Sequence, residues 1–149
     1  MNLNLLEAEL RRDEGVRYYR YLDSRGIPTT GVGHNLRARP LPAGWKYPLS
    51  EGQVNQLLAE DLADTFAELD RRLAWWRNLD EVRQRVIANM AFNMGVDKLL
   101  GFKNTLAAVQ RGAYAAAAGG MRASLWFTQV GQRAVRLAKA MESGVMPTA

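Results

Sequence analysis

Apolar residues near the start of the chain recur at the spacing of one helix face. Leu3, Leu6 and Leu10 share that face, and Gly15 stands just beyond it, where a left-handed C-cap is expected. The pattern therefore predicts a first helix over residues 3–14, with Glu14 in its last turn.

The pattern then changes from helical to strand-like. Two β-prone runs, 18–22 and 27–32, are separated by the turn-forming tetrapeptide 23–26, which predicts a β-hairpin. Because Pro28 has no N–H to donate to a ladder, we expect its strand at a sheet edge or beside a bulge.

A proline-rich loop and a long helix come next. Prolines between Arg37 and Pro48 disfavour both regular structures. Ser50 followed by Gln53 has the form of a capping box, and the apolar stripe behind it predicts a helix over 51–74 that connects two lobes. The stripe consists of Val54, Leu57, Leu58, Leu62, Phe66, Leu69 and Leu73.

Every periodic segment after residue 74 is helical. Asp80 can cap a helix that Gly95 follows, and shorter helices are expected at 105–110, 114–123 and 132–142. The core face of the Asp80 helix is predicted to hold Val82, Val86, Ile87, Met90 and Met94. The expected fold class is α+β in one domain. It comprises a β-hairpin lobe at about 15–50, the connecting helix, and a larger all-helical lobe of residues 75–149 with the first helix.

Composition narrows the class of protein. A chain of 149 residues, 48% hydrophobic and without cysteine, can bury a core without disulfides, and it offers no thiolate site for zinc. A net charge of +5 favours polyanionic surroundings, which include nucleic acid, anionic lipid and acidic wall polymers. No nucleic-acid recognition motif or long basic stripe is present, so nucleic acid is not an expected partner.

The first residues contain no apolar run long enough for a signal peptide or a membrane span. We therefore expect synthesis in the cytosol and no stable membrane insertion. The chain is also expected to be a monomer.

Asp13 and Glu14 are adjacent carboxylates near the end of the predicted first helix. The helix dipole is negative there, which disfavours ionisation, so Glu14 could serve as a general acid. The common alternative is a solvated acidic pair at a helix end.

The hairpin that follows carries Asp23 in its turn and Thr29 on its returning strand. Folded over the helix end, it could bring a carboxylate and a hydroxyl to face Glu14 across a cleft, as glycoside cleavage requires. The alternatives are an Asx turn for Asp23 and simple β-propensity for Thr29.

These residues resemble a known family. Asp13-Glu14-Gly15, Asp23 and the run Thr29-Thr30-Gly31-Val32-Gly33-His34 are similar to the phage-type lysozymes, family 24 of the glycoside hydrolases. The resemblance continues to about Gly144 through 89–95, 101–104, 124–127, Arg133 and Arg136. It implies a lysozyme-like fold.

The resemblance also implies an activity. The chain would be a muramidase that hydrolyses the β-1,4 bond between N-acetylmuramic acid and N-acetylglucosamine of bacterial peptidoglycan, with inversion and without a metal or organic cofactor. Glu14 would be the general acid, and Asp23 and Thr29 would position a water.

Residues of the helical lobe would support the site. The resemblance implies that Arg133 pairs with Glu14 and that Arg136 pairs with Asp13. Two arginines three residues apart project from nearly one helix face, which makes these pairs geometrically possible. Solvated arginines are the alternative.

Several further residues receive roles from the resemblance or from their type. Phe92 and Asn93 are expected to line the saccharide cleft, with a contact from Thr105. Trp126 is assigned to the core, and Trp75-Trp76 are more typical of packing than of sugar stacking.

His34 is the only histidine and is expected to be structural, paired with Asp61 on the long helix. The segment 36–50 does not match the family, so the resemblance gives no expectation for the outer wall of the cleft. Gly119-Gly120 stand where relatives can carry a polar cleft residue.

Two functions other than that of a muramidase are compatible with the sequence. A lytic transglycosylase has a related fold and a catalytic Glu but leaves an anhydro sugar, and a noncatalytic basic protein could bind walls or membranes. The resemblance suggests an endolysin held in the host cytoplasm until a holin-like protein opens the membrane, after which it reaches the periplasm and wall. A free, prophage-encoded or virion-associated protein is equally compatible.

Overall fold

The computed structural model of the chain describes residues 1–148 and divides into two units. The sheet unit is Leu3–Asp64, and the helical unit is Met1–Asn2 with the chain from Thr65 onward. The first helix belongs to the sheet unit, whereas the sequence analysis grouped it with the later helices.

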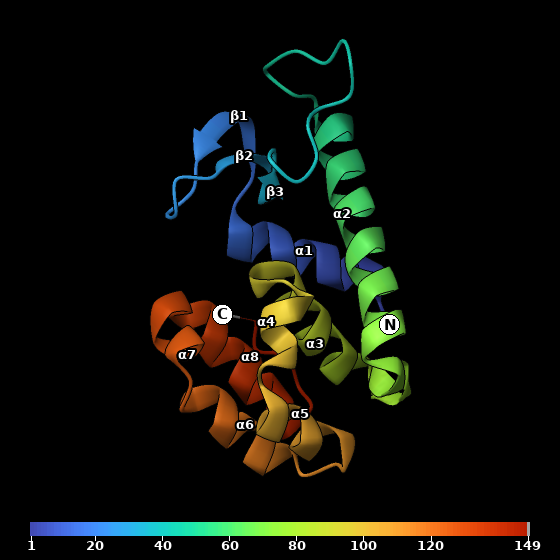
Figure 1. Cartoon of the computed structure of the whole chain (residues 1–149), viewed down its shortest axis with the longest axis vertical. Coiled ribbons are helices and arrows are strands. Elements are labelled where there is room, and N and C mark those ends of the chain that lie inside the picture. Colours follow the sequence, from blue (N-terminus) through green and yellow to red (C-terminus); the bar gives the residue numbers. More distant parts are fainter. Residues whose placement is uncertain (149) are drawn as a thin grey trace. The chain divides into compact units, whose positions relative to one another are not determined.

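The sheet unit begins with helix α1, Leu3–Glu14, which confirms the predicted first helix. Strands β1, Arg17–Leu22, and β2, Pro28–Gly31, form the predicted hairpin, and a two-residue strand β3, His34–Asn35, was not predicted. Figure 1 shows this small sheet near the C-terminal end of α1.

The sheet is antiparallel in the order β1-β2-β3. Tyr21 pairs with Thr29 across β1 and β2, Thr29 pairs with Asn35 across β2 and β3, and the register is irregular between Arg17 and Tyr21. Pro28 does not lie at a sheet edge, because β2 is the central strand, but the irregular register of the paired strand β1 fits the alternative expectation of a bulge. Pro28 is tolerated as the first residue of its strand, where its carbonyl accepts a hydrogen bond from Leu36 N.

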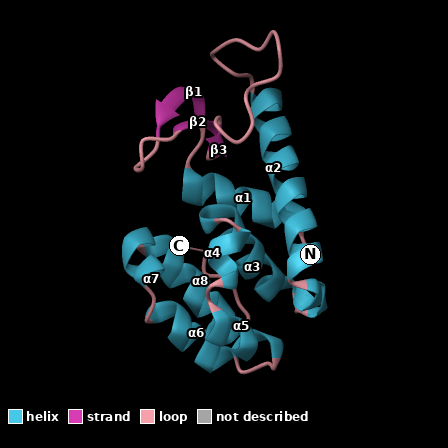
Figure 2. Cartoon of the chain, in the orientation of Figure 1, coloured by secondary structure: helices cyan, strands magenta, loops and turns pink. Residues whose placement is uncertain are grey.

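Residues 36–50 contain no helix or strand, as predicted, and lead into helix α2, Glu51–Arg72 (Figure 2). The capping box is confirmed: Gln53 N donates to Ser50 Oγ at 3.1 Å, and Ser50 N donates to Gln53 Oε1 at 2.9 Å. α2 ends two residues earlier than predicted, and its residues up to Asp64 belong to the sheet unit.

The helical unit continues with a short 3-10 helix and six α-helices. They are η1 Ala74–Asn78, α3 Glu81–Met94, α4 Val96–Leu100, α5 Lys103–Gln110, α6 Tyr114–Arg122, α7 Leu125–Val130 and α8 Gln132–Ser143. Asp80 caps α3 as predicted, through a 3.1 Å hydrogen bond from Arg83 N. The sequence analysis missed α4 and α7, since five or six residues are too few to show a helical period.

The core of this unit is apolar and rich in small residues. On α3, Val86, Ile87 and Met90 are buried as predicted, while Val82 and Met94 are only partly buried. α6 and α8 add buried alanines together with Met121, Leu137 and Met141. No helix within residues 1–148 is long and apolar enough to cross a membrane.

Candidate active site

Glu14 lies at the last position of α1, where the chain turns into the sheet. Gly15 ends the helix with φ +76°, and its N–H donates to Arg11 O at 3.1 Å. The Glu14 carboxyl lies directly against Gly33, in the turn between β2 and β3. A Cβ on Gly33 would stand 2.8 Å from Glu14 Oε1, so only glycine admits the carboxyl in this position.

Asp23 and Thr29 both hydrogen bond to the backbone of one residue, Ile27. Ile27 N donates to Asp23 Oδ1 at 2.9 Å, and Ile27 O accepts from Thr29 Oγ1 at 2.7 Å and from Asp23 N at 3.0 Å. The hairpin turn therefore brings the predicted carboxylate and hydroxyl together and fixes the orientation of both.

The Asp23 carboxylate is held in its ionised form. Hydrogen bonds from the N–H groups of Ile27 and Arg25, and the positive charges of Arg25 and Arg37, lower the pKa of Asp23 below its ordinary value, although desolvation opposes them. Its second oxygen, Oδ2, accepts no hydrogen bond from the described residues and is available to a ligand. Asp23 also forms the Asx turn that was the alternative to a catalytic role, and this turn orients its carboxylate.

Thr29 presents its oxygen as an acceptor. It is buried, and because its hydroxyl hydrogen is donated to Ile27 O, the lone pairs of Oγ1 remain for another donor such as water. Asp23 Oδ2 and Thr29 Oγ1 are thus two acceptor oxygens whose side chains are both held by the backbone of Ile27.

His34 is buried beside the site and pairs with Asp61, as predicted. Its Nδ1 lies 2.7 Å from Asp61 Oδ2, and its Nε2 lies 2.8 Å from the carbonyl oxygen of Arg39. Burial by itself lowers the pKa of His34, but the hydrogen bond and charge of Asp61 and the Arg39 carbonyl raise it above its ordinary value.

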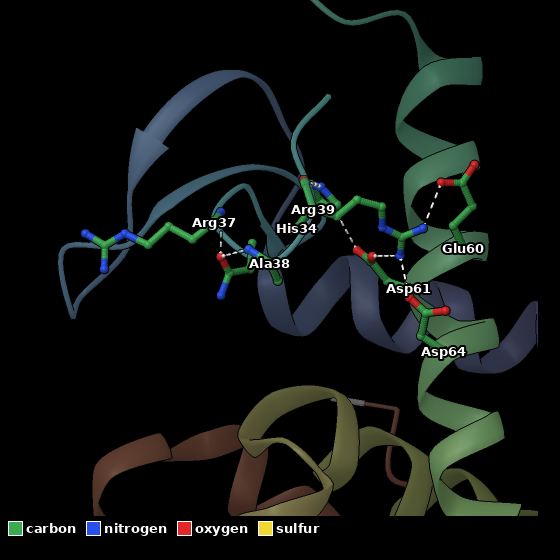
Figure 3. A network of polar contacts seen from close by, with 8 residues as sticks. His34, Arg37, Ala38, Arg39, Glu60, Asp61 and Asp64 are labelled. Carbon is green, nitrogen blue, oxygen red and sulfur yellow. Dashed lines mark hydrogen bonds and ion pairs between the residues drawn. The ribbon is translucent and has the colours of Figure 1, made fainter. Parts of the chain in front are cut away.

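Arg39 ties the first part of the 36–50 loop to α2. Its guanidinium contacts Glu60 Oε2 at 3.0 Å, Asp61 Oδ1 at 2.7 Å and Asp64 Oδ2 at 2.7 Å (Figure 3). The same residue therefore contacts His34 through its backbone and the partner of His34 through its side chain.

The other predicted site residues lie in the helical unit, apart from Asp13, whose side chain accepts from Arg12 Nε at 3.2 Å. Arg133 is buried on α8 and donates from Nε to Asn89 Oδ1 at 2.9 Å, and Arg136 is partly buried on the same helix. The pairings of Arg133 with Glu14 and of Arg136 with Asp13 stay predictions.

The proposed saccharide contacts are also engaged in packing. Asn93 Oδ1 accepts from Trp126 Nε1 at 2.7 Å, which agrees with the assignment of Trp126 to the core. Thr105 is buried on α5, where its Oγ1 occupies the space that a Cβ on Gly120 would need. Phe92 is partly buried on α3. Trp76 is fully buried and donates to Asp70.

Sequence reasoning missed two contributions to the site. Ile27 acts through its backbone N–H and carbonyl and leaves no residue-type signal. Gly33 could have been recognised, because a glycine beside a proposed catalytic turn indicates close approach. Among residues 1–148 no group of three or more His, Cys, Asp or Glu side chains is arranged to hold a metal ion.

Comparisons with known proteins identify the family of the chain. The model of the phage lysozyme family matches residues 11–140. The chain is 31% identical to the pre-baseplate central spike protein Gp5 of Enterobacteria phage T4, over 96% of this chain but only 28% of that protein. It is 27% identical to the probable T4-type lysozyme 1 of Dictyostelium discoideum, over 92% of this chain and 93% of that protein.

A third relative is the endolysin of Salmonella phage P22, which is 31% identical over 63% of each chain. The family match covers most of the chain and includes the turn that carries Asp23 and Thr29. The chain belongs to the phage lysozyme family.

Proposed function

We propose that this chain is a muramidase, which hydrolyses the β-1,4 bond between N-acetylmuramic acid and N-acetylglucosamine in bacterial peptidoglycan. The observation that carries the proposal is that the backbone of Ile27 binds the side chains of both Asp23 and Thr29, in a chain of the phage lysozyme family. Glu14, beside Gly33 at the end of α1, is the third member of the site.

Each of the three residues has a separate task. Glu14 donates a proton to the glycosidic oxygen as the bond breaks. A water donates hydrogen bonds to Asp23 Oδ2 and Thr29 Oγ1, which leaves a lone pair to attack the anomeric carbon, and the Asp23 carboxylate takes up the proton that the water loses. Attack by water from the face opposite the leaving group inverts the configuration at this carbon.

The helical unit supplies the proposed supporting contacts. Arg133 pairs with Glu14, Arg136 pairs with Asp13, and Phe92, Asn93 and Thr105 contact the saccharide. Two hydrogen bonds support these roles. Asn89 accepts from Arg133 and so orients its guanidinium, and Trp126 donates to Asn93 and so orients its amide.

The decisive test is Glu14→Gln, with Glu7→Gln as its matched control. Both changes remove one carboxylate from α1, but Glu7 makes no contact with the site turn. On purified peptidoglycan we expect Glu14→Gln to lose about 100- to 10,000-fold in rate, the usual contribution of a general acid, and Glu7→Gln to retain activity. Equal clearance by wild type and Glu14→Gln would instead identify a noncatalytic wall-binding protein.

Product analysis separates hydrolysis from its nearest rival. We expect mass spectrometry to find reducing N-acetylmuramic acid ends that carry one added water. An anhydromuramic end would identify a lytic transglycosylase and remove the water-positioning role of Asp23 and Thr29.

We further propose that the protein acts as a monomeric endolysin. It would stay in the host cytoplasm until a holin-like protein opens the membrane and then act on the wall from the periplasm. The likeness to the P22 endolysin supports this route. Lysis timing after expression with and without a membrane-permeabilising agent tests it: lysis without permeabilisation would contradict the proposal.

A further inference from the structure

Tyr21 shares the sheet face of Thr29 but received no role from the sequence. The two residues are directly paired across β1 and β2, and the next pair along the ladder, Leu22 with Pro28, is also in register. Side chains of directly opposed residues lie on one face with their Cβ atoms about 5 Å apart. The Tyr21 ring therefore stands beside the proposed water-binding hydroxyl.

The electrostatic surroundings of Tyr21 place it near both proposed catalytic carboxylates. Burial, followed by the negative charges of Glu14 and Asp23, raises the pKa of Tyr21, and only Arg17 opposes them. The phenol consequently remains neutral at physiological pH and can both donate and accept a hydrogen bond.

The Tyr21 ring contacts Arg17, whereas its hydroxyl forms no hydrogen bond within residues 1–148. The Arg17 guanidinium carbon lies 4.5 Å from the centre of the Tyr21 ring, within the range of a cation–π contact. Arg17 is exposed and forms no ion pair with the described residues, so stacking on Tyr21 is its one specific contact in residues 1–148. Tyr21 is partly buried, and its hydroxyl has no hydrogen-bond partner among the same residues.

We propose that Tyr21 is a substrate-positioning residue, whose hydroxyl hydrogen bonds a polar group of the sugar beside the scissile bond while Arg17 fixes the plane of the ring. The inference rests on the proposed muramidase function and adds to it a contact on the sheet side of the site. The hydroxyl of a partly buried tyrosine, near an acid and a water-positioning carboxylate and without a partner among residues 1–148, is suited to a hydroxyl or acetamido group of the substrate.

The test is Tyr21→Phe, with Tyr19→Phe as its control. Tyr19 lies on the same strand but is exposed and stacks on Tyr47, with ring centres 6.5 Å apart. On a soluble peptidoglycan fragment of defined length we expect Tyr21→Phe to raise KM about tenfold, as for one lost hydrogen bond, with kcat nearly unchanged. Its thermal unfolding temperature should equal that of the wild type, because the hydroxyl has no hydrogen-bond partner within residues 1–148.

Arg17→Gln provides a second arm, with Arg20→Gln as an equal change of charge on the same strand. We expect Arg17→Gln to raise KM about two- to threefold and Arg20→Gln to leave KM unchanged. Of these two arginines, Arg17 is the one that stacks on the Tyr21 ring. Binding of the same fragment to Glu14→Gln and to the Glu14→Gln/Tyr21→Phe double variant, measured by calorimetry, reports the contact without catalysis.

The possible outcomes distinguish the role of Tyr21 from the muramidase function. An active wild type with Tyr21→Phe kinetics and fragment affinity equal to those of Tyr19→Phe overturns the role of Tyr21 alone. A wild type that neither binds nor cleaves the fragment overturns the muramidase function and this inference together. Weaker fragment binding in the double variant than in Glu14→Gln supports the role of Tyr21.

Discussion

The side chains that fix the candidate site in the sheet unit are mostly polar, whereas the helical unit is held by apolar packing. In the sheet unit, Asp23 is oriented by N–H groups, and His34 by Asp61 and a carbonyl. In the helical unit, α3, α6 and α8 bury Ile87, Met121 and Leu137 almost completely. Polar contacts depend on protonation and direction, but apolar contacts depend on volume, so the two units should respond to different perturbations.

The contrast is not absolute. Val54 and Leu57 of α2 lie against the backbone of Gly31, so β2 also has an apolar support. Conversely, the Asn89 bond to Arg133 is a buried polar contact of the helical unit. The difference concerns which contacts set the orientation of the proposed reactive groups, and in the sheet unit these are hydrogen bonds and ion pairs.

The largest expected effect on stability is from Ile87→Ala in the helical unit. Ile87 is 1% exposed, and removal of a buried aliphatic side chain to alanine destabilises by about 2–5 kcal/mol. Urea unfolding should show this loss equally at pH 5.5 and pH 8.5, since no charge is involved. Leu125→Ala, at a residue 72% exposed, should change stability by less than about 0.5 kcal/mol. A loss for Ile87→Ala that varies with pH would break the comparison.

Gly33→Ala should have the largest effect on activity that does not involve a reactive group. The new Cβ would displace the Glu14 carboxyl, and misplacement of a catalytic group by about 1 Å can lower the rate about 100-fold. Gly44→Ala is the matched control, because Gly44 also has a positive φ but nothing within 4 Å of an added Cβ. Both variants carry backbone strain of about 1–2 kcal/mol, so equal activities would contradict the Glu14 placement.

The length of an element decided how well the sequence predicted it. Long periodic segments were predicted well: the helices at Leu3–Glu14, Glu51–Arg72 and Glu81–Met94 each span three turns or more. Strand β3 and helices α4 and α7 were missed, because two to six residues carry no measurable period.

The candidate site was predictable in its residue types but not in its geometry. The residue types of Glu14, Asp23 and Thr29 made them candidates, but their roles were assigned by the resemblance to the phage-type lysozymes. The Ile27 link depends on turn geometry and the position of Tyr21 on ladder register, and a single sequence fixes neither. The Asp61 partner of His34 was predicted, but the Arg39 contacts were not, since the loop has no periodicity.

Adjacent glycines on α6 test packing in the helical unit at a smaller scale. Gly120→Ala should destabilise by about 1–3 kcal/mol, because its Cβ would meet Thr105 Oγ1. Gly119→Ala should instead stabilise by about 0.5–1 kcal/mol, since a Cβ there meets nothing within 4 Å and alanine favours the helix. Adding Thr105→Ala to Gly120→Ala should restore part of the loss in urea unfolding. A loss unchanged by that addition would mean that the two residues do not compete for space.

The smallest expected effect is a pH dependence confined to the sheet unit. The pKa of folded His34 is raised, because Asp61 and the Arg39 carbonyl outweigh burial. The stabilisation by protonated His34 is therefore complete below the unfolded pKa of about 6.5 and is lost as pH rises through the folded pKa.

Asp61→Asn removes the carboxylate that favours protonation, so burial should then dominate and lower the pKa of His34. The variant should lose about 1 kcal/mol at pH 5.5, the net value of one hydrogen bond, and less at pH 8.5. Asp64→Asn is the control, because Asp64 contacts Arg39 but not His34. NMR titration of His34 and urea unfolding at both pH values measure the two consequences. A difference between wild type and Asp61→Asn that grows with pH would reverse the expected sign and exclude this role for the pair.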